Sequence, residues 1–270
     1  MASITIDGNM TQIAFTIGTL VTNPDLYAGM LNSFREKGFG DDCEYIKIDN
    51  TGTQQIDAYA GLNILLNQAK APFVILCHQD VVLLEDGRKE LEARLRELSE
   101  IDPNWALAGN AGGSGPLKLH IRITDKGRKH HIVNDPFPVR VYTLDENFII
   151  VKAESRISLS RDLSGFHMYG ADICMVADML GWNSYVIDFH LLHLGEGRMG
   201  EPFAASVRQF QKKWNMALRG RYLRTTCTHV LLTGGNDIRS KLYFIYLKNY
   251  NKMRRFLVSV KSIIARRIMG

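Results

Sequence analysis

The feature that most constrains the fold is a regular alternation of strand-like and helix-like segments over the first 110 residues. Short apolar runs of strand length alternate with longer segments whose apolar residues recur at helical spacing. This alternation predicts an α/β fold, with a mostly parallel, Rossmann-like sheet covered by helices on both faces. The predicted strands cover residues 13–21, 44–48, 73–77 and 105–108, and the predicted helices cover residues 24–37, 57–69 and 86–98.

The pattern is weaker between residues 112 and 145, where Gly, Pro, Lys and His are frequent. Such composition is typical of mobile loops and short antiparallel strands. Beyond it we expect strands over residues 148–151, 184–188 and 191–194, and helices over residues 169–180 and 201–218.

Cysteine usage and hydropathy bound the class of protein. None of the four cysteines forms a CxxC pair, so a zinc knuckle is not expected. Cys77 and Cys174 lie in apolar runs and are expected to be small buried residues in a reducing compartment. No N-terminal stretch resembles a signal peptide, and no run reaches the about 18 apolar residues of a membrane span. We therefore expect a cytoplasmic protein.

The charge is divided unevenly along the chain. Residues 202–270 hold 15 Lys or Arg and a single acid, whereas residues 1–201 hold 18 basic and 27 acidic residues. We expect a catalytic domain over residues 1–200 and a helical basic extension over residues 201–270. The extension either packs on the domain or lies at an anionic membrane surface, which would make the protein peripheral to the membrane. Non-specific contact with nucleic acid is a further possibility for the extension, and no specific nucleic acid is expected.

Polar clusters follow three of the predicted strands, where parallel sheets bind ligands. Asn23 follows the first, Asp49-Asn50 the second and His78-Gln79-Asp80 the third. Asp80, together with a diphosphate, offers the oxygen ligands that Mg²⁺ or Mn²⁺ prefers. An Asp after a strand is also common as a turn or cap residue, so the tripeptide alone is a weak signal.

Two later residues are further candidates. Asp172 is expected in the first turn of a helix, where the helix dipole favours an ionised carboxylate able to act as a general base. His193 ends an apolar run and is a possible partner for Asp80 in a metal site, with His190 competing for the same role. Each residue also has a plain structural interpretation, as a helix acid or as a buried histidine.

The order of these motifs resembles a branch of the glycosyltransferase family 2-like proteins, in which HQD stands where most GT-A enzymes have DxD. The resemblance spans roughly residues 13–200 and rests on motif order and spacing. The matching pieces are Asn23-Pro24, Ile48-Asp49-Asn50, Gly61-Leu62-Asn63, residues 73–81 (FVILCHQDV), residues 165–172 (GFHMYGAD) and residues 185–194 (YVIDFHLLHL).

The resemblance implies a GT-A fold and a hexosyltransferase-like enzyme that transfers a sugar from a nucleoside diphosphate donor. The acceptor would be a hydroxyl of a glycan, a lipid-linked glycan or a small molecule, as in polysaccharide biosynthesis, and the sequence does not choose between them. Asp80 and His193 would hold Mn²⁺ or Mg²⁺, and Asp172 would be the base of an inverting reaction. Donor-nucleotide contacts would come from Asp49, Asn23, Asn63, His78 and Gln79. His78 in place of an acid removes one negative charge from the metal site.

Two expectations concern the middle of the chain. The loop at residues 112–115 is expected to line the acceptor side or close over the donor. The basic residues that could assist the leaving diphosphate are Arg122, Lys126 and Arg128, between which the sequence does not choose.

Other functions fit less well. A sugar-phosphate nucleotidyltransferase would carry a Gly-rich basic loop after the first strand, where residues 19–24 read TLVTNP. A dinucleotide oxidoreductase would need GxGxxG at that position. A non-catalytic GT-A-like binding or scaffolding module stays open as the alternative.

Overall fold

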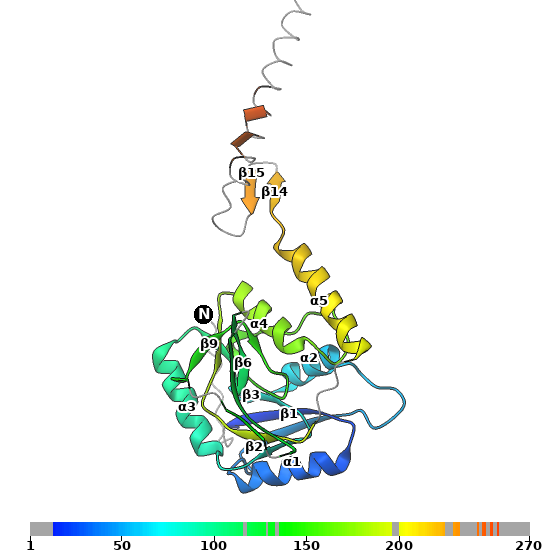
Figure 1. Ribbon diagram of the computed structural model, residues 1–270, viewed down its shortest axis with the longest axis vertical. Helices are drawn as coiled ribbons and strands as arrows, with labels where there is room; N and C mark the ends of the chain where they lie inside the picture. Colours follow the sequence, from blue (N-terminus) through cyan, green and yellow to red (C-terminus); the bar gives the residue numbers. More distant parts are fainter. Residues whose placement is uncertain are drawn as a thin grey trace, which may run out of the picture. The chain divides into compact units, whose positions relative to one another are not determined.

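The computed structural model describes residues 13–115, 118–127, 129–132, 135–195, 200–224 and 229–232, with residues 242, 245, 246, 249, 250 and 253. The chain forms two compact units, residues 1–210 and residues 211–270. The unit of residues 1–210 holds the predicted α/β domain (Figure 1).

A seven-stranded mixed sheet forms the centre of this unit. Parallel pairing joins β1 to β2 and to β3, and joins β12 to β5. β11 runs antiparallel between β3 and β5, and β9 lies antiparallel on β12. The order is β2 (Cys43–Asp49), β1 (Phe15–Val21), β3 (Phe73–Cys77), β11 (Phe148–Lys152), β5 (Trp105–Gly109), β12 (Asn183–Val186) and β9 (Val139–Val141).

Helices cover both faces of this sheet (Figure 1). α1 (Pro24–Glu36) and α3 (Arg88–Ile101) pack on one face, and α2 (Ala58–Gln68) and α4 (Tyr169–Met179) on the other. Neighbouring residues of the central strands alternate between the two cores: Ile75 joins the first, and Val74 and Leu76 join the second. Strands buried on both faces therefore appear in the sequence as continuous apolar runs. A 3-10 turn, Ala153–Ser155, follows β11.

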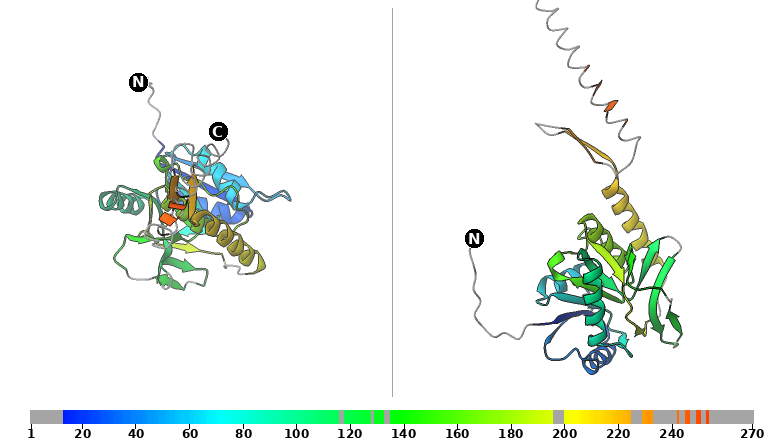
Figure 2. Two further views of the ribbon diagram at one scale, coloured as in Figure 1. Left: turned by 90° about the horizontal axis from the view of Figure 1, so that it is seen from above. Right: turned by 90° about the vertical axis from the view of Figure 1, so that its left-hand side faces the viewer.

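A second, smaller sheet stands at one edge of this unit, as the green strands in both views of Figure 2 show. Its order is β10 (Thr143–Leu144), β6 (Ala111–Gly115), β7 (Lys118–Asp125), β13 (Leu191–His193) and β4 (Val81–Leu83), with β8 (His130–Ile132) paired to β7. The predicted loop at residues 112–115 is thus wrong, because these residues belong to β6. A Cβ at Gly112 would lie 2.2 Å from the carbonyl oxygen of Thr143, so glycine is what lets β10 pair so closely.

Within the described residues after 200, a helix and a strand hairpin stand where the sequence predicts a helical extension. α5 (Glu201–Leu218) confirms the predicted helix and runs across the boundary between the units. It is followed by an antiparallel hairpin of β14 (Arg221–Arg224) and β15 (His229–Leu232), which the sequence did not predict. Most of residues 239–270, on which the predicted membrane contact depends, lie outside the described residues. No helix within the described part of the chain has the length and hydropathy of a membrane span.

Two buried polar contacts tie α2 to the chain that leads into α4. The carboxamide of Asn63 accepts a hydrogen bond from the Leu159 amide at 2.8 Å and donates one to the Leu159 carbonyl at 3.0 Å. Asn63 is 9% exposed, so both bonds are shielded from water. The carboxamide is therefore engaged in holding the fold, and this placement does not favour the predicted contact of Asn63 with the donor nucleotide.

We expect Asn63→Ala to lower the free energy of unfolding by about 2–3 kcal/mol, because it leaves two buried backbone groups of Leu159 without a partner. Urea denaturation followed by circular dichroism measures this change. Asn67→Ala, at an exposed position of the same helix, is the matched control and should change stability by less than about 0.5 kcal/mol. Equal effects of the two substitutions would contradict the structural role of Asn63.

Candidate metal and substrate site

The candidate site begins where β3 ends. His78 and Asp80 follow Cys77, the last residue of β3, and the chain then turns into β4. β13 pairs antiparallel with β4 and sets His193 opposite Val81. The amide of Leu194 donates to the carbonyl of Asp80 at 2.9 Å, which extends this pairing by one residue. Two segments more than 100 residues apart in the sequence thus place His193 beside the HQD turn.

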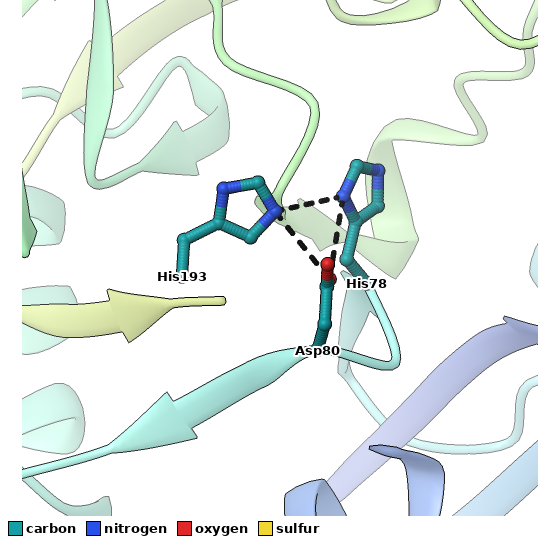
Figure 3. Close-up of side chains that lie close together, drawn as sticks. All are labelled: His78, Asp80 and His193. Carbon is teal, nitrogen blue, oxygen red and sulfur yellow. Dashed lines mark hydrogen bonds and ion pairs between the residues drawn. The ribbon is translucent and has the colours of Figure 1, made fainter. Parts of the chain in front are cut away.

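Three side chains converge at this point, as Figure 3 shows. His193 Nε2 lies 3.4 Å from Asp80 Oδ1 and 3.4 Å from His78 Nδ1, and His78 Nδ1 lies 3.9 Å from Asp80 Oδ1. Two atoms that bind one ion at about 2.1 Å and at right angles lie about 3 Å apart. The three atoms therefore need to move only slightly to bind one ion.

The electrostatics of the three side chains differ. Burial favours the neutral form of His78 and, with the neighbouring His193, lowers the pKa of His78. Burial acts on His193 in the same direction, but the hydrogen bond and the charge of Asp80 outweigh it and raise the pKa of His193. Burial would raise the pKa of Asp80, and His193 and His78 together hold it below its usual value. Asp80 thus stays ionised, as a metal ligand must.

Tyr169, at the start of α4, orients the ring of His78. Its hydroxyl donates to the carbonyl of Glu146 at 3.0 Å and lies 2.6 Å from His78 Nε2. A phenol has one proton, so while Tyr169 donates to Glu146 it accepts from His78 Nε2–H. In the neutral ring this leaves the lone pair on Nδ1, the nitrogen that faces Asp80 and His193.

Gly195 completes the pocket around these ligands. A Cβ at this position would lie 2.5 Å from Asp80 Oδ2 and 3.1 Å from His193 Nε2. Glycine therefore leaves open the space beside the second carboxylate oxygen of Asp80 and beside His193 Nε2, one of the three ligand atoms. One carboxylate and two imidazoles are also a recognised donor set for a divalent transition-metal ion with open coordination positions. On both grounds the residues fit a bound divalent cation.

Two cavities meet at this cluster. The smaller, which we call the strand-end cavity, has a volume of about 220 Å³ and reaches Leu20 and Thr22 at the end of β1. The larger, the outer cavity, has a volume of about 590 Å³, and His167 and Phe203 are among its lining residues. Among the described residues, those that line both cavities are His78, Asp80, Glu146 and Phe166.

The residues predicted to contact the donor nucleotide are dispersed. His78 and Gln79 line the strand-end cavity, but His78 also belongs to the metal cluster. Gln79 accepts hydrogen bonds from the amides of Thr22 and Asn23 and so ties the turn after β1 to the HQD turn. The side chain of Asn23 caps α1. Asp49 is exposed at the end of β2, where Thr51 holds its pKa below the usual value, and its contact with the nucleotide stays a prediction.

Asp172 lies in the first turn of α4, as predicted, but its side chain is fully buried. Its two carboxylate oxygens accept hydrogen bonds from the amide and the hydroxyl of Ser160, both at 2.8 Å. It lines neither the strand-end cavity nor the outer cavity. Because a general base must reach the acceptor hydroxyl, this placement argues against the predicted role of Asp172 as the catalytic base.

The remaining candidates are His190, the rival metal ligand, and the three basic residues that could assist the leaving diphosphate. His190 is turned away from Asp80, with Nε2 2.7 Å from the Thr124 hydroxyl, so His193 is the partner of Asp80. Arg122 is engaged in an ion pair with Asp188. Lys126 lies in the turn after β7, and Arg128 lies outside the described residues.

Sequence reasoning missed Glu146 and the role of Tyr169. Glu146 directly follows the weakly patterned region of residues 112–145, and only the fold brings it to the cavities. Tyr169 was part of the GFHMYGAD motif, but nothing in the motif indicates that its hydroxyl would reach His78.

The fold is that of the GT-A glycosyltransferases. The structure of a mannosyltransferase from Pyrobaculum calidifontis, in complex with GDP-Man and Mn²⁺, superposes with a TM-score of 0.51 over 76% of this chain and 65% of that chain. The sequence identity is 14%, so the likeness concerns the fold, which many functions share. The chain spans about two thirds of the length of that mannosyltransferase.

No protein-family model matches the chain. A relative from Fuscovulum blasticum, named ATP synthase subunits region ORF 6, is 34% identical over 239 residues, covering 85% of this chain and 94% of its own length. The chain belongs to the same family as this protein, whose name gives no activity.

We expect Gly195→Ala to weaken Mn²⁺ binding about 10-fold or more, because the added methyl group occupies the space beside Asp80 and His193. Isothermal titration with MnCl₂ measures the affinity. Gly52→Ala is the control, since a Cβ at Gly52 meets no atom within 4 Å. Unchanged Mn²⁺ affinity in Gly195→Ala would contradict the assigned pocket.

Tyr169→Phe should weaken Mn²⁺ binding by about 10–100-fold, because His78 loses the partner that fixes its tautomer and ring orientation. The same titration detects the loss, and a thermal melt shows whether the domain stays folded. Wild-type affinity in a folded Tyr169→Phe protein would show that Tyr169 does not orient His78.

Proposed function

We propose that this protein is a glycosyltransferase that moves a sugar from a nucleoside diphosphate sugar to an acceptor hydroxyl, assisted by a divalent cation. The observation that carries the proposal is the cluster of His78, Asp80 and His193 at the end of β3, between two cavities of a GT-A fold. Ligands of open α/β sheets bind beyond the carboxyl ends of the strands, which is where this cluster lies.

The donor set favours Mn²⁺ over Mg²⁺. Mg²⁺ prefers oxygen ligands in near-ideal octahedral geometry, whereas two of the three ligand atoms here are imidazole nitrogens. Imidazole suits transition-metal ions, among which Mn²⁺ also accepts carboxylate and phosphate oxygens. The structurally similar mannosyltransferase was obtained with Mn²⁺ and GDP-Man, which supports the same pairing of ion and donor class here.

In the proposed arrangement, the donor nucleotide enters the strand-end cavity and the acceptor enters the outer cavity. Thr22, Gln79 and the neighbouring turn after β1 border the donor, and exposed Asp49 at the end of β2 extends this border. His78, Asp80 and His193 hold the cation, which when bound counters the charge that develops on the leaving diphosphate. The exposed ring of Phe166, which lines both cavities, offers an apolar face to a sugar ring.

Several finer features belong to this proposal. The reaction inverts the configuration at the anomeric carbon, and the acceptor is a glycan, a lipid-linked glycan or a small molecule in glycan biosynthesis. The basic residues after 201 attract an anionic membrane surface, which would hold the enzyme at the cytoplasmic face near a lipid-linked acceptor.

A melting assay with nucleoside diphosphates and nucleotide sugars, each with MnCl₂ or MgCl₂, tests the proposal. A ligand that binds only the folded protein raises the midpoint of unfolding. We expect a larger shift with Mn²⁺ than with Mg²⁺ for one nucleotide, and loss of the Mn²⁺-dependent part in Asp80→Asn.

Asp178→Asn, at an exposed position of α4, is the matched control and should keep the full shift. No shift with any nucleotide under either metal would refute the proposal and favour a GT-A-like binding module without activity.

A further inference from the structure

Four of the described residues line both the strand-end cavity and the outer cavity, and they differ in chemical character. Of the four described residues that line both cavities, His78 and Asp80 belong to the metal cluster and Phe166 is apolar. The remaining one, Glu146, carries a carboxylate that the metal cluster does not use. In a transfer reaction, the group that accepts the proton has to lie where the donor and acceptor meet, and Glu146 occupies such a position.

The fold holds Glu146 firmly in this place. Glu146 lies in the short segment between β10 and β11. Its backbone carbonyl accepts a hydrogen bond from the Tyr169 hydroxyl, and its carboxylate Oε1 lies 3.5 Å from the Gly170 amide nitrogen at the start of α4. Gly170 makes this approach possible, because a Cβ there would lie 3.2 Å from Glu146 Cγ and 2.3 Å from the Leu144 carbonyl oxygen. The side chain is half-buried, so it remains accessible from the cavities.

We propose that Glu146 is the carboxylate that accepts the proton of the acceptor hydroxyl. This proposal rests on the proposed glycosyltransferase function. As the acceptor oxygen forms its bond to the anomeric carbon, its O–H bond breaks and the proton passes to a carboxylate oxygen of Glu146. The bond between the anomeric carbon and the donor phosphate breaks at the same time, and its electron pair leaves with the diphosphate.

The environment of Glu146 suits this role. Burial, together with the nearby charge of Asp145, raises the pKa of Glu146 to about 7, while the amides of residues 168–170 act in the opposite direction. A general base works best with a pKa near the working pH, where a substantial fraction is ionised and still basic enough to accept a proton.

The other candidates nearby are less suitable. Asp172 is fully buried, with both oxygens bonded to Ser160. Asp145 is exposed, and its Oδ1 already accepts from the amide and the carboxamide of Asn147. His167 lines only the outer cavity, where its ring packs edge-on against Phe203.

The test measures release of nucleoside diphosphate from GDP-mannose, UDP-glucose and UDP-N-acetylglucosamine with MnCl₂, using water and free mono- and disaccharides as acceptors. We expect Glu146→Gln to lower the rate of release by about 10²–10⁴-fold, while the Mn²⁺-dependent melting shift with the donor stays as in the wild type. Formate should restore part of the rate in Glu146→Ala, because it replaces the missing carboxylate. Glu154→Gln, at an exposed site remote from both cavities, should behave as the wild type.

Three results would overturn the assignment: release within about threefold of the wild type in Glu146→Gln, loss of donor binding in the same variant, or no rescue by formate. A large loss of release in Asp145→Asn or in folded Asp172→Asn, with Glu146→Gln active, would assign the role to that residue. If the wild type releases no diphosphate from any donor, the proposed function itself fails, and the role of Glu146 fails with it.

Discussion

The antiparallel pairing of β13 with β4 is the interaction on which the site depends. His78 and Asp80 are fixed by the end of β3, but His193 reaches them only because β13 lies against the strand that follows the HQD turn. The hydrogen bond from Leu194 to Asp80 continues this pairing into the site itself. β13 also pairs with β7, so the second sheet holds His193 in place next to the end of β3.

In the proposed metal site, His78 contributes no charge, so a cation would meet one carboxylate and two neutral imidazoles. Two features keep this arrangement favourable for a cation: Tyr169 directs the lone pair of His78 toward the cluster, and Gly195 leaves the adjoining space open. The proposed preference for a transition-metal ion rests on this donor set and not on the GT-A architecture.

Much of the fold was predictable from the sequence, because the central strands are buried on both faces and the helices carry clear apolar periodicity. The run at residues 73–77 coincides with β3, and the Asn23-Pro24 turn indeed begins α1. The strands of the second sheet were harder to predict, since residues 112–115 are nearly all glycine and their pairing depends on contacts distant in sequence. The hairpin after α5 was missed because its apolar runs are very short, two residues in β14 (RYLR) and three in β15 (HVLL).

The candidate site was predictable only where its residues carry a signal in the local sequence. Asp80 and His193 were proposed as partners because Asp80 follows one apolar run and His193 ends another. The interpretation of Asp172 rested on its position in a helix, and that position is correct, but sequence cannot show that the carboxylate faces Ser160 in the interior. Glu146 carries no local signal, since its importance arises from the packing of the segment after β10 against α4.

Pulsed electron paramagnetic resonance of the Mn²⁺-bound protein with ¹⁵N-labelled histidine tests whether His78, Asp80 and His193 hold one metal ion. We predict coupling to two histidine nitrogens in the wild type, to one in His193→Ala and to one in His78→Ala. Mn²⁺ bound with no histidine coupling in the wild type, or with coupling unchanged by both substitutions, would contradict it.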